Sequence, residues 1–291
     1  MSEVILIGID LAKRVFQLHG ARSDGSVAYR KKLSRGQLLA FVAQQPKCLI
    51  AMEECATAHG WGREFEKLGH DVRLIPPAYV KPFVKRQKND VADAEAIVEA
   101  ALRPTMRFVA VKTEDQQARA MLFRTLQMFV GQRTQMINAL RGHLAEHGLV
   151  AARGPAHLKT LAHALADNDT ALLTEVRELG QMYLEQIEGL NARIAELDTK
   201  MRCATQKAEV VRRAKTMPGV SPVTALAIET FAPDLATFKR GRDFAAWLGL
   251  VPKQHSTGGK ARLRKTSNPL GTMLRMTLPG NGWDSATSAP S

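Results

Sequence analysis

The sequence predicts an α/β domain with a mixed sheet, followed by a long helical arm and a small, mostly helical C-terminal domain. In the first part of the chain, short apolar runs alternate first with turns and then with helical segments, which indicates one sheet-based domain. In the middle, apolar residues recur at a spacing of three and four over several heptads. The last part changes to short apolar segments and basic loops.

The α/β domain is expected to occupy residues 1–112. It opens with VILIGI, a β-branched run that predicts a buried strand ending at Asp10. Two more strands, separated by the turn-prone segment RSDGS, complete a predicted three-strand meander. Strand and helix then alternate, which favours a mixed sheet. The expected elements are strands at 4–9, 15–21 and 26–33, a helix from Ser34, a strand at 48–52 before Glu53, a helix at 58–68, a strand at 71–75, and a helix from Asp90 to Leu102.

Residues 113–212 are expected to form a helical coiled-coil arm. The segment TEDQ is similar to a capping box and opens a helix that runs to about Gly148, and a second helix is expected to begin near Asp169. An antiparallel hairpin or a zipper between two copies fits this pattern, and a plain helical bundle is the alternative. The two apolar stripes consist of Leu122, Leu126, Phe129, Ile137, Leu140 and Leu144, and of Val176, Leu179, Tyr183, Ile187, Leu190, Ile194, Leu197 and Met201.

The predicted C-terminal domain, residues 213–268, begins with a turn that resembles a helix-hairpin-helix element. In MPGVSPVTALAI, Gly219 and the following small-residue helix would offer backbone N–H groups to DNA phosphate. Ser221 stands where such a turn usually has a second glycine, and an ordinary helix–turn–helix connection is the alternative. The remaining residues, 269–291, are rich in Gly, Ser and Pro and are expected to form a disordered tail.

A basic loop follows this turn. No acidic residue occurs between Asp243 and Asp284, and the loop contains the pair Gly258-Gly259. A stretch of one charge sign with glycines predicts a loop that faces phosphate, and a solvated basic loop is the alternative. The cations expected to bind nucleic acid here are Lys253, Lys260, Arg262, Arg264 and Lys265.

Composition favours a polyanionic partner. The chain has 291 residues, 41 Lys and Arg against 28 Asp and Glu, and a net charge of +13. Such a balance suits DNA or RNA, because cations set against phosphates release counterions. Three cysteines without a C-x-x-C pair argue for a reducing compartment. Because we find neither a signal-peptide pattern nor an apolar run long enough to span a membrane, we expect a cytoplasmic protein without a membrane partner.

Four acidic residues stand where predicted elements end or begin. Asp10 and Glu53 each end a strand, whereas Asp90 and Asp93 begin a helix and share one of its faces. Converging carboxylates repel one another unless a cation joins them, and Mg²⁺ prefers oxygen ligands. We therefore expect these four residues to hold Mg²⁺, as two ions suited to phosphodiester chemistry. Ordinary helix caps and surface ion pairs are the alternative.

Two further features belong to this predicted site. Lys85, Arg86 and Lys88 precede the paired aspartates and are expected to contact the phosphates on which the metal acts. Ser256 lies in the cationic segment HSTGGK, where its hydroxyl could attack a phosphodiester and hold DNA covalently. Metal-bound water could instead perform hydrolysis, which would make the protein an endonuclease.

Several segments together resemble a known family. GIDLAKRVFQLHG, AMEECATAHGWGREFEKLGHDVRLIPPAYVKPFVKRQKNDVADAEAI, INALRGHLAEHG, MPGVSPVTALAI and GRDFAAWLGLVPKQHSTGGK are similar to the DEDD transposases of insertion-sequence family 110, relatives of the Piv DNA invertase. The resemblance covers roughly residues 4–268. It implies a RuvC-like, ribonuclease-H-like N-terminal domain, a coiled-coil arm, and a C-terminal transposase domain with a serine nucleophile.

The resemblance also implies roles for individual residues. The first acid of the family pattern falls on Asp10, the second on Glu53 rather than Glu54, and the K-x-D-x-x-D-A signature on the segment from Lys88 to Ala94. The nucleophile falls on Ser256. The family further implies Mg²⁺, double-stranded donor and target DNA, a guiding bridge RNA, and homodimers that pair into tetramers.

The resemblance is expected to fade after about Ser267, where a polar tail replaces the arginine-rich helix usual in the family. A truncated or frame-shifted copy would explain this difference. Three functions therefore stand side by side: an insertion-sequence transposase, a RuvC-like metal-dependent endonuclease that uses water, and an inactive remnant that binds nucleic acid.

Overall fold

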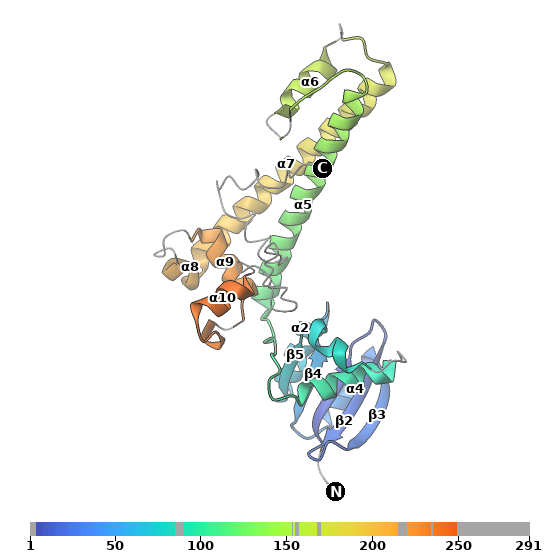
Figure 1. Ribbon diagram of the computed structural model, residues 1–291, viewed down its shortest axis with the longest axis vertical. Coiled ribbons are helices and arrows are strands. Elements are labelled where there is room, and N and C mark those ends of the chain that lie inside the picture. Colours follow the sequence, from blue (N-terminus) through green and yellow to red (C-terminus); the bar gives the residue numbers. More distant parts are fainter. Residues whose placement is uncertain are drawn as a thin grey trace, which may run out of the picture. The chain divides into compact units, whose positions relative to one another are not determined.

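The computed structural model of the chain describes residues 4–84, 90–152, 154, 157–167, 170–214, 220–233 and 235–248, and for residues 90, 91, 207, 210 and 214 the backbone alone. The chain divides into two units, with the boundary between Asp115 and Gln116. Figure 1 shows the first unit as a sheet with helices and the second as a set of helices.

The first unit is built on a mixed five-stranded sheet in the order β3-β2-β1-β4-β5. The first three strands form the predicted antiparallel meander, and β4 and β5 add to it in parallel. The prediction of a mixed α/β sheet is therefore confirmed, and the sheet is consistent with the ribonuclease-H-like domain that the resemblance implies. The strands are β1 (Val4–Asp10), β2 (Val15–Arg22), β3 (Val27–Ser34), β4 (Leu49–Glu53) and β5 (Asp71–Ile75).

One face of the sheet is covered by α1 (Arg35–Ala43) and α2 (Ala58–Lys67). The helix α1 begins where predicted, because the backbone N–H and the hydroxyl of Ser34 both donate to Gln37 Oε1, at 3.0 and 2.8 Å. Alternate residues of the strands pack against these two helices. The fully buried members of this core include Ile7, Ile9, Phe16, Leu18, Leu38, Val42, Ile50, Met52, Phe65 and Leu74.

The opposite face is covered by α4 (Asp90–Ala101), which follows α3 (Pro77–Val80) and the short 3₁₀ helix η1 (Lys81–Phe83). Figure 1 shows α4 lying across the sheet. A Cβ atom placed on Gly8 would lie 2.5 Å from Val98 Cγ2 and 2.7 Å from the carbonyl oxygen of Ala94. The missing side chain of Gly8 therefore lets the helix backbone approach β1 closely.

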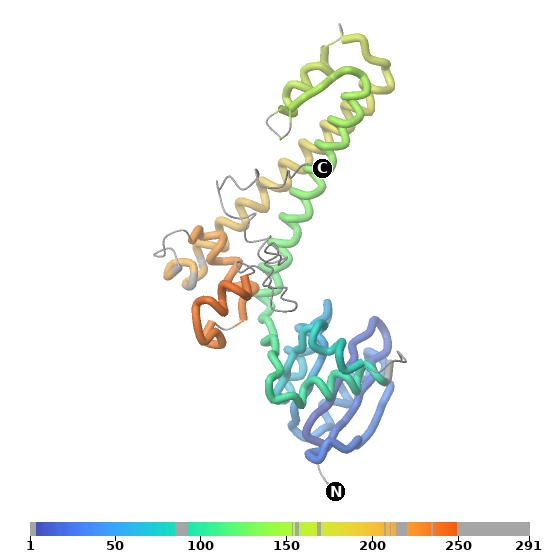
Figure 2. Tube along the Cα trace, viewed as in Figure 1, coloured from blue at the N-terminus to red at the C-terminus, as the bar shows by residue number. Residues whose placement is uncertain are grey.

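The second unit contains two long helices that run side by side in Figure 2. They are α5 (Glu114–Ala145), whose first two residues belong to the first unit, and α7 (Thr174–Lys207). In the chain, α6 (Leu158–Ala166) comes between these two helices, in a segment for which no helix was predicted. Helices are therefore present in both segments where long helices were predicted, and the coiled-coil arm itself stays a prediction. Their shared core, with α6, consists of Ile137, Leu140, Leu144, Leu161, Leu165 and Ile187.

The structure differs from the predicted stripe of α7 at its N-terminal end. Helix α7 begins at Thr174 rather than near Asp169, and Leu179 is 57% exposed. The buried neighbour is Gly180 instead, where an added Cβ would lie 2.7 Å from the Leu165 side chain of α6. Helix α6 packs against this end of α7, which heptad spacing does not reveal. At this end the buried face of α7 therefore contains Gly180 instead of Leu179.

Short helices complete the described part of the second unit. They pack against α5 and α7 through Ala120, Phe123, Met201 and the buried side chains of α9. Ser221 begins α9 as its N-cap, since its hydroxyl accepts a hydrogen bond from the Thr224 N–H at 3.1 Å. That role explains a serine where the turn motif has glycine. The elements are α8 (Glu209–Ala214), α9 (Pro222–Phe231), the 3₁₀ helix η3 (Leu235–Thr237) and α10 (Gly241–Trp247).

Within the described ranges, no helix has both the length and the apolar character needed to cross a membrane.

Candidate active site

Two of the four predicted acids meet on one face of the sheet. Side chains alternate along a strand, so Asp10 lies on the same face as Leu6 and Gly8, which pack under α4. By the same alternation Glu53 lies on the face of Ala51. Ile9 is paired with Met52 in the parallel β1–β4 ladder, and therefore Asp10 and Glu53 are the next neighbours across it. Both side chains are half-buried.

Helix α4 brings the third predicted acid to the same face. Ala94 lies over Gly8, which is two residues before Asp10, and Asp93 directly precedes Ala94. Asp93 is half-buried, whereas Ala94 is 2% exposed, so the alanine of the K-x-D-x-x-D-A signature provides the close contact with the sheet. Asp90 is the first residue of α4. Its side chain lies outside the described residues.

The described acids carry carboxylate oxygens, the kind of ligand that Mg²⁺ prefers. Asp10 and Glu53 are neighbours, and Asp93 is on the helix that covers them. Among the described side chains, no group of three His, Cys, Asp or Glu residues is close enough to hold a metal ion. The structure therefore places Asp10 and Glu53 on one face and Asp93 on the helix that covers it, and the four-residue metal site stays a prediction.

Two polar residues of β2 share this face and were not predicted as part of the site. Gln17 is paired with Asp10, and His19 is paired with Gly8. Both are buried, with exposed fractions of 9% and 3%. The signal that could have revealed them is their spacing, since polar residues two apart in an otherwise apolar strand point to the same face.

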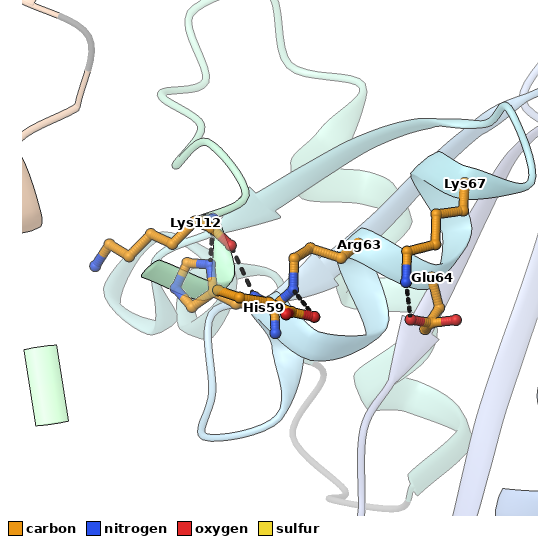
Figure 3. Close-up of polar contacts among 6 residues, drawn as sticks. His59, Arg63, Glu64, Lys67 and Lys112 are labelled. Carbon is orange, nitrogen blue, oxygen red and sulfur yellow. Dashed lines mark hydrogen bonds and ion pairs between the residues drawn. The ribbon is translucent and has the colours of Figure 1, made fainter. Parts of the chain in front are cut away.

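Glu54 lies in a different environment from Glu53. Its Oε1 is 3.6 Å from His59 Nε2, and the backbone N–H of Lys112 donates to His59 Nδ1 at 3.1 Å. Because Nδ1 accepts this bond, the proton of the neutral ring is on Nε2 and faces Glu54. Arg63 Nη1 donates to the Lys112 carbonyl oxygen at 2.8 Å (Figure 3). Glu54 therefore belongs to a polar cluster that fixes α2 to the segment before α5.

This cluster also decides between two roles for His59. Cys55 and His59 are four residues apart, a spacing that metal ligands can have, but both nitrogens of His59 face protein partners. The ring therefore acts as a structural bridge between Glu54 and Lys112 in this conformation.

Replacing His59 with alanine is expected to lower the free energy of unfolding by about 2 kcal/mol, because the Lys112 N–H loses its acceptor and a buried ring is removed. Urea denaturation followed by circular dichroism measures this change. The control is Lys67→Ala on the same helix, whose ion pair with Glu64 is exposed to solvent and should contribute far less to stability than the buried ring of His59. Equal effects of the two substitutions would contradict the bridging role.

The remaining predicted site residues lie outside the described residues. For these positions the structure gives no placement, and their assignments stay predictions. They are Lys85, Arg86, Lys88, Gly219, Lys253, Ser256, Lys260, Arg262, Arg264 and Lys265.

Family models match both ends of the chain. A model described as a transposase, of the DEDD type of IS110, matches residues 7–148. A second, described as the transposase IS116/IS110/IS902 family, matches residues 211–288. The second match continues past Ser267, and so the expectation that the resemblance fades there is wrong.

Curated relatives match nearly the whole chain. A probable family 20 transposase of Pseudomonas aeruginosa is 44% identical over 274 residues, which cover 94% of this chain and 81% of the relative. The transposase for insertion sequence element IS1328 of Yersinia enterocolitica is 41% identical, with 96% and 83% covered. The transposase for element IS1111A of Coxiella burnetii is 36% identical, with 96% and 77% covered. The chain therefore belongs to the IS110 family of insertion-sequence transposases, enzymes that cut and rejoin DNA.

Proposed function

We propose that this transposase cuts and rejoins DNA with Mg²⁺-binding carboxylates and a serine nucleophile. The observation that supports the proposal most directly is that Asp10 and Glu53 directly follow the paired residues Ile9 and Met52, on the face that α4 covers. Because Gly8 lets α4 approach this face, the helix that begins at Asp90 packs closely on the same sheet. Asp10, Glu53, Asp90 and Asp93 are the proposed metal ligands.

Carboxylates on neighbouring strands and on a covering helix suit a divalent cation, since ligands from rigid elements keep their positions. Bound Mg²⁺, which we propose as two ions, would stabilise the charge that develops on the phosphate oxygens during transfer. The protein's own contribution is to hold the four carboxylates together against their mutual repulsion. Glu54, which contacts His59, is not among the proposed ligands.

The proposed nucleophile is Ser256. Its Oγ would attack phosphorus, forming a phosphoserine bond while the bond from phosphorus to the leaving sugar oxygen breaks. The serine proton leaves the hydroxyl, and the sugar oxygen takes up a proton. A hydroxyl of the second DNA would then attack the phosphoserine, which releases Ser256 and rejoins the strands.

Nucleic acid would bind through the cations that precede the aspartates and follow α10. Lys85, Arg86 and Lys88, the turn at Gly219, and the basic residues Lys253, Lys260, Arg262, Arg264 and Lys265 are proposed to contact phosphates. The net charge of +13 supports a nucleic-acid partner. We further propose donor and target DNA, a bridge RNA as the guide, and a homodimer or homotetramer as the active form.

Trapping the protein on a suicide DNA substrate tests the nucleophile. A covalent protein–DNA adduct is expected with the full chain and Mg²⁺, and Ser256→Ala should eliminate it. Ser267→Ala, in the same segment, is the control and should keep the adduct. Denaturing gels followed by mass spectrometry of the adduct measure both outcomes.

The same assay separates the alternatives. Mg²⁺-dependent cleavage that survives Ser256→Ala would contradict the serine mechanism and favour the RuvC-like endonuclease that uses water. DNA binding without cleavage or adduct would favour an inactive remnant.

A further inference from the structure

The row of side chains that contains the paired acids continues to the edge of the sheet. Asp10 is paired with Gln17 on β2, and Gln17 is paired with Lys32 on β3. Residues paired across strands point to the same face, so Glu53, Asp10, Gln17 and Lys32 form one row on the face of the sheet against which α4 packs. Adjacent strands are about 4.8 Å apart, which places the Cα atoms of Asp10 and Lys32 roughly 10 Å from each other.

Lys32 differs from the cations beside it on β3. Arg30 is on the same face but forms an ion pair with Glu95 of α4, with Nη2 3.2 Å from Oε2. Lys31 is on the opposite face, where its Nζ lies 4.6 Å from the centre of the Phe41 ring. Lys32 is exposed, and no described carboxylate forms an ion pair with it. Its charge is therefore available to an external anion.

The edge position makes this charge accessible. Strand β3 is the last strand of the described sheet at this end, so nothing in the described sheet continues the row past Lys32. Its ammonium group offers three N–H donors, and the neighbouring Gln17 amide offers two more. Phosphodiester oxygens are acceptors that suit both groups.

We propose that Lys32 and Gln17 form a phosphate-binding subsite that holds the DNA strand beside the Asp10 and Glu53 carboxylates. The proposal rests on the proposed function, because it treats those carboxylates as the place of cleavage. A strand whose reacting phosphate lies at Asp10 would bring a neighbouring phosphate to Lys32 along the row. The cation at the edge would also offset the repulsion between the strand and the acids before metal joins them.

The test compares charge removal on the two faces of one strand. In the full chain carrying Asp93→Asn, which prevents cutting during the measurement, Lys32→Gln is expected to weaken DNA binding about tenfold at low salt. The slope of log affinity against log salt should fall by about one. Lys31→Gln, the matched control, should change the affinity less than twofold. Fluorescence anisotropy across a salt series gives both quantities.

The position of the phosphate that contacts Lys32 is tested with a set of DNAs, each of which contains one neutral methylphosphonate. At one position, the methylphosphonate should weaken DNA binding by the protein that has Lys32. The same DNA should bind the Lys32→Gln variant no more weakly than unsubstituted DNA does, as expected when the lysine and that phosphate interact. Similar losses of DNA affinity for Lys31→Gln and Lys32→Gln would overturn the proposal, because they would show that the positive charge of the strand acts without a defined phosphate site. No loss for Lys32→Gln, or a loss only for RNA of the same sequence, would also overturn it.

These measurements remain informative if the proposed function fails. Affinity does not require cleavage, so a chain that never cuts DNA would refute the mechanism but could still show the Lys32-dependent loss. Conversely, normal adduct formation together with unchanged Lys32→Gln binding would refute the subsite and leave the mechanism intact.

Discussion

Asp93→Asn is expected to abolish DNA strand cleavage while DNA affinity stays within about threefold of that of the unchanged protein. Asparagine has nearly the same shape as aspartate but carries no charge, so a metal ligand is weakened without disturbing the packing of α4. A loss of several kcal/mol in transition-state stabilisation lowers the rate about a thousandfold or more. Asp90→Asn should have the same effect. Mg²⁺-dependent nicking and fluorescence anisotropy measure cleavage and binding separately.

The control for this prediction is Glu99→Gln. Glu99 is also on α4, but it is half-exposed and forms an ion pair with Arg103, at 2.7 Å, away from the predicted site. Cleavage by this variant should be unchanged. Full cleavage by both Asp90→Asn and Asp93→Asn would refute the assignment of the helix acids to metal.

Gly8→Ala is expected to lower the free energy of unfolding by about 3 kcal/mol, the largest stability effect that we predict. The new Cβ would meet the backbone oxygen of Ala94 and the side chain of Val98, and a helix backbone cannot yield as a flexible side chain does. The helix must move away from β1, and the aspartates at its start move with it. We therefore expect slower cleavage even where the variant remains folded.

Urea denaturation measures the stability of Gly8→Ala, and cleavage at a temperature where the variant is folded measures the second effect. Gly60→Ala is the matched control, because Gly60 lies in α2 with open space around its Cβ position. It should stabilise the chain by about 0.5–1 kcal/mol. Unchanged stability of Gly8→Ala would show that the close approach of α4 is not needed.

Much of the first unit could be predicted because its strands carry their own signals. The apolar runs that end at Asp10 and Glu53 are buried strands. The alternation of strand and helix after the first three strands predicts the mixed sheet, in which β4 and β5 are added in parallel. The helix from Asp90 was predicted, and its residues Ala94, Ile97 and Val98 are buried against the sheet. The spacing of apolar residues is sufficient to predict a strand or helix where the buried residues recur at the period of that element.

Other features depend on pairing between distant segments and could not be predicted. The row from Asp10 to Lys32 is set by the register of β1, β2 and β3, and sequence spacing alone does not fix a register. The exposure of Leu179 follows from the packing of α6, a short helix without a strong signal of its own. The contact between Glu54 and His59 depends on how α2 packs beside the end of β4, which sequence spacing does not reveal.

The charges on β3 have a second consequence, for the behaviour of the protein without nucleic acid. An edge strand presents unpaired backbone N–H and C=O groups, and such a strand can pair with the edge of another chain and start aggregation. On β3, Arg30, Lys31 and Lys32 project in alternation to both faces of this edge. A second copy approaching in register would bring like charges together on each face, so the cations keep the sheet from growing between molecules.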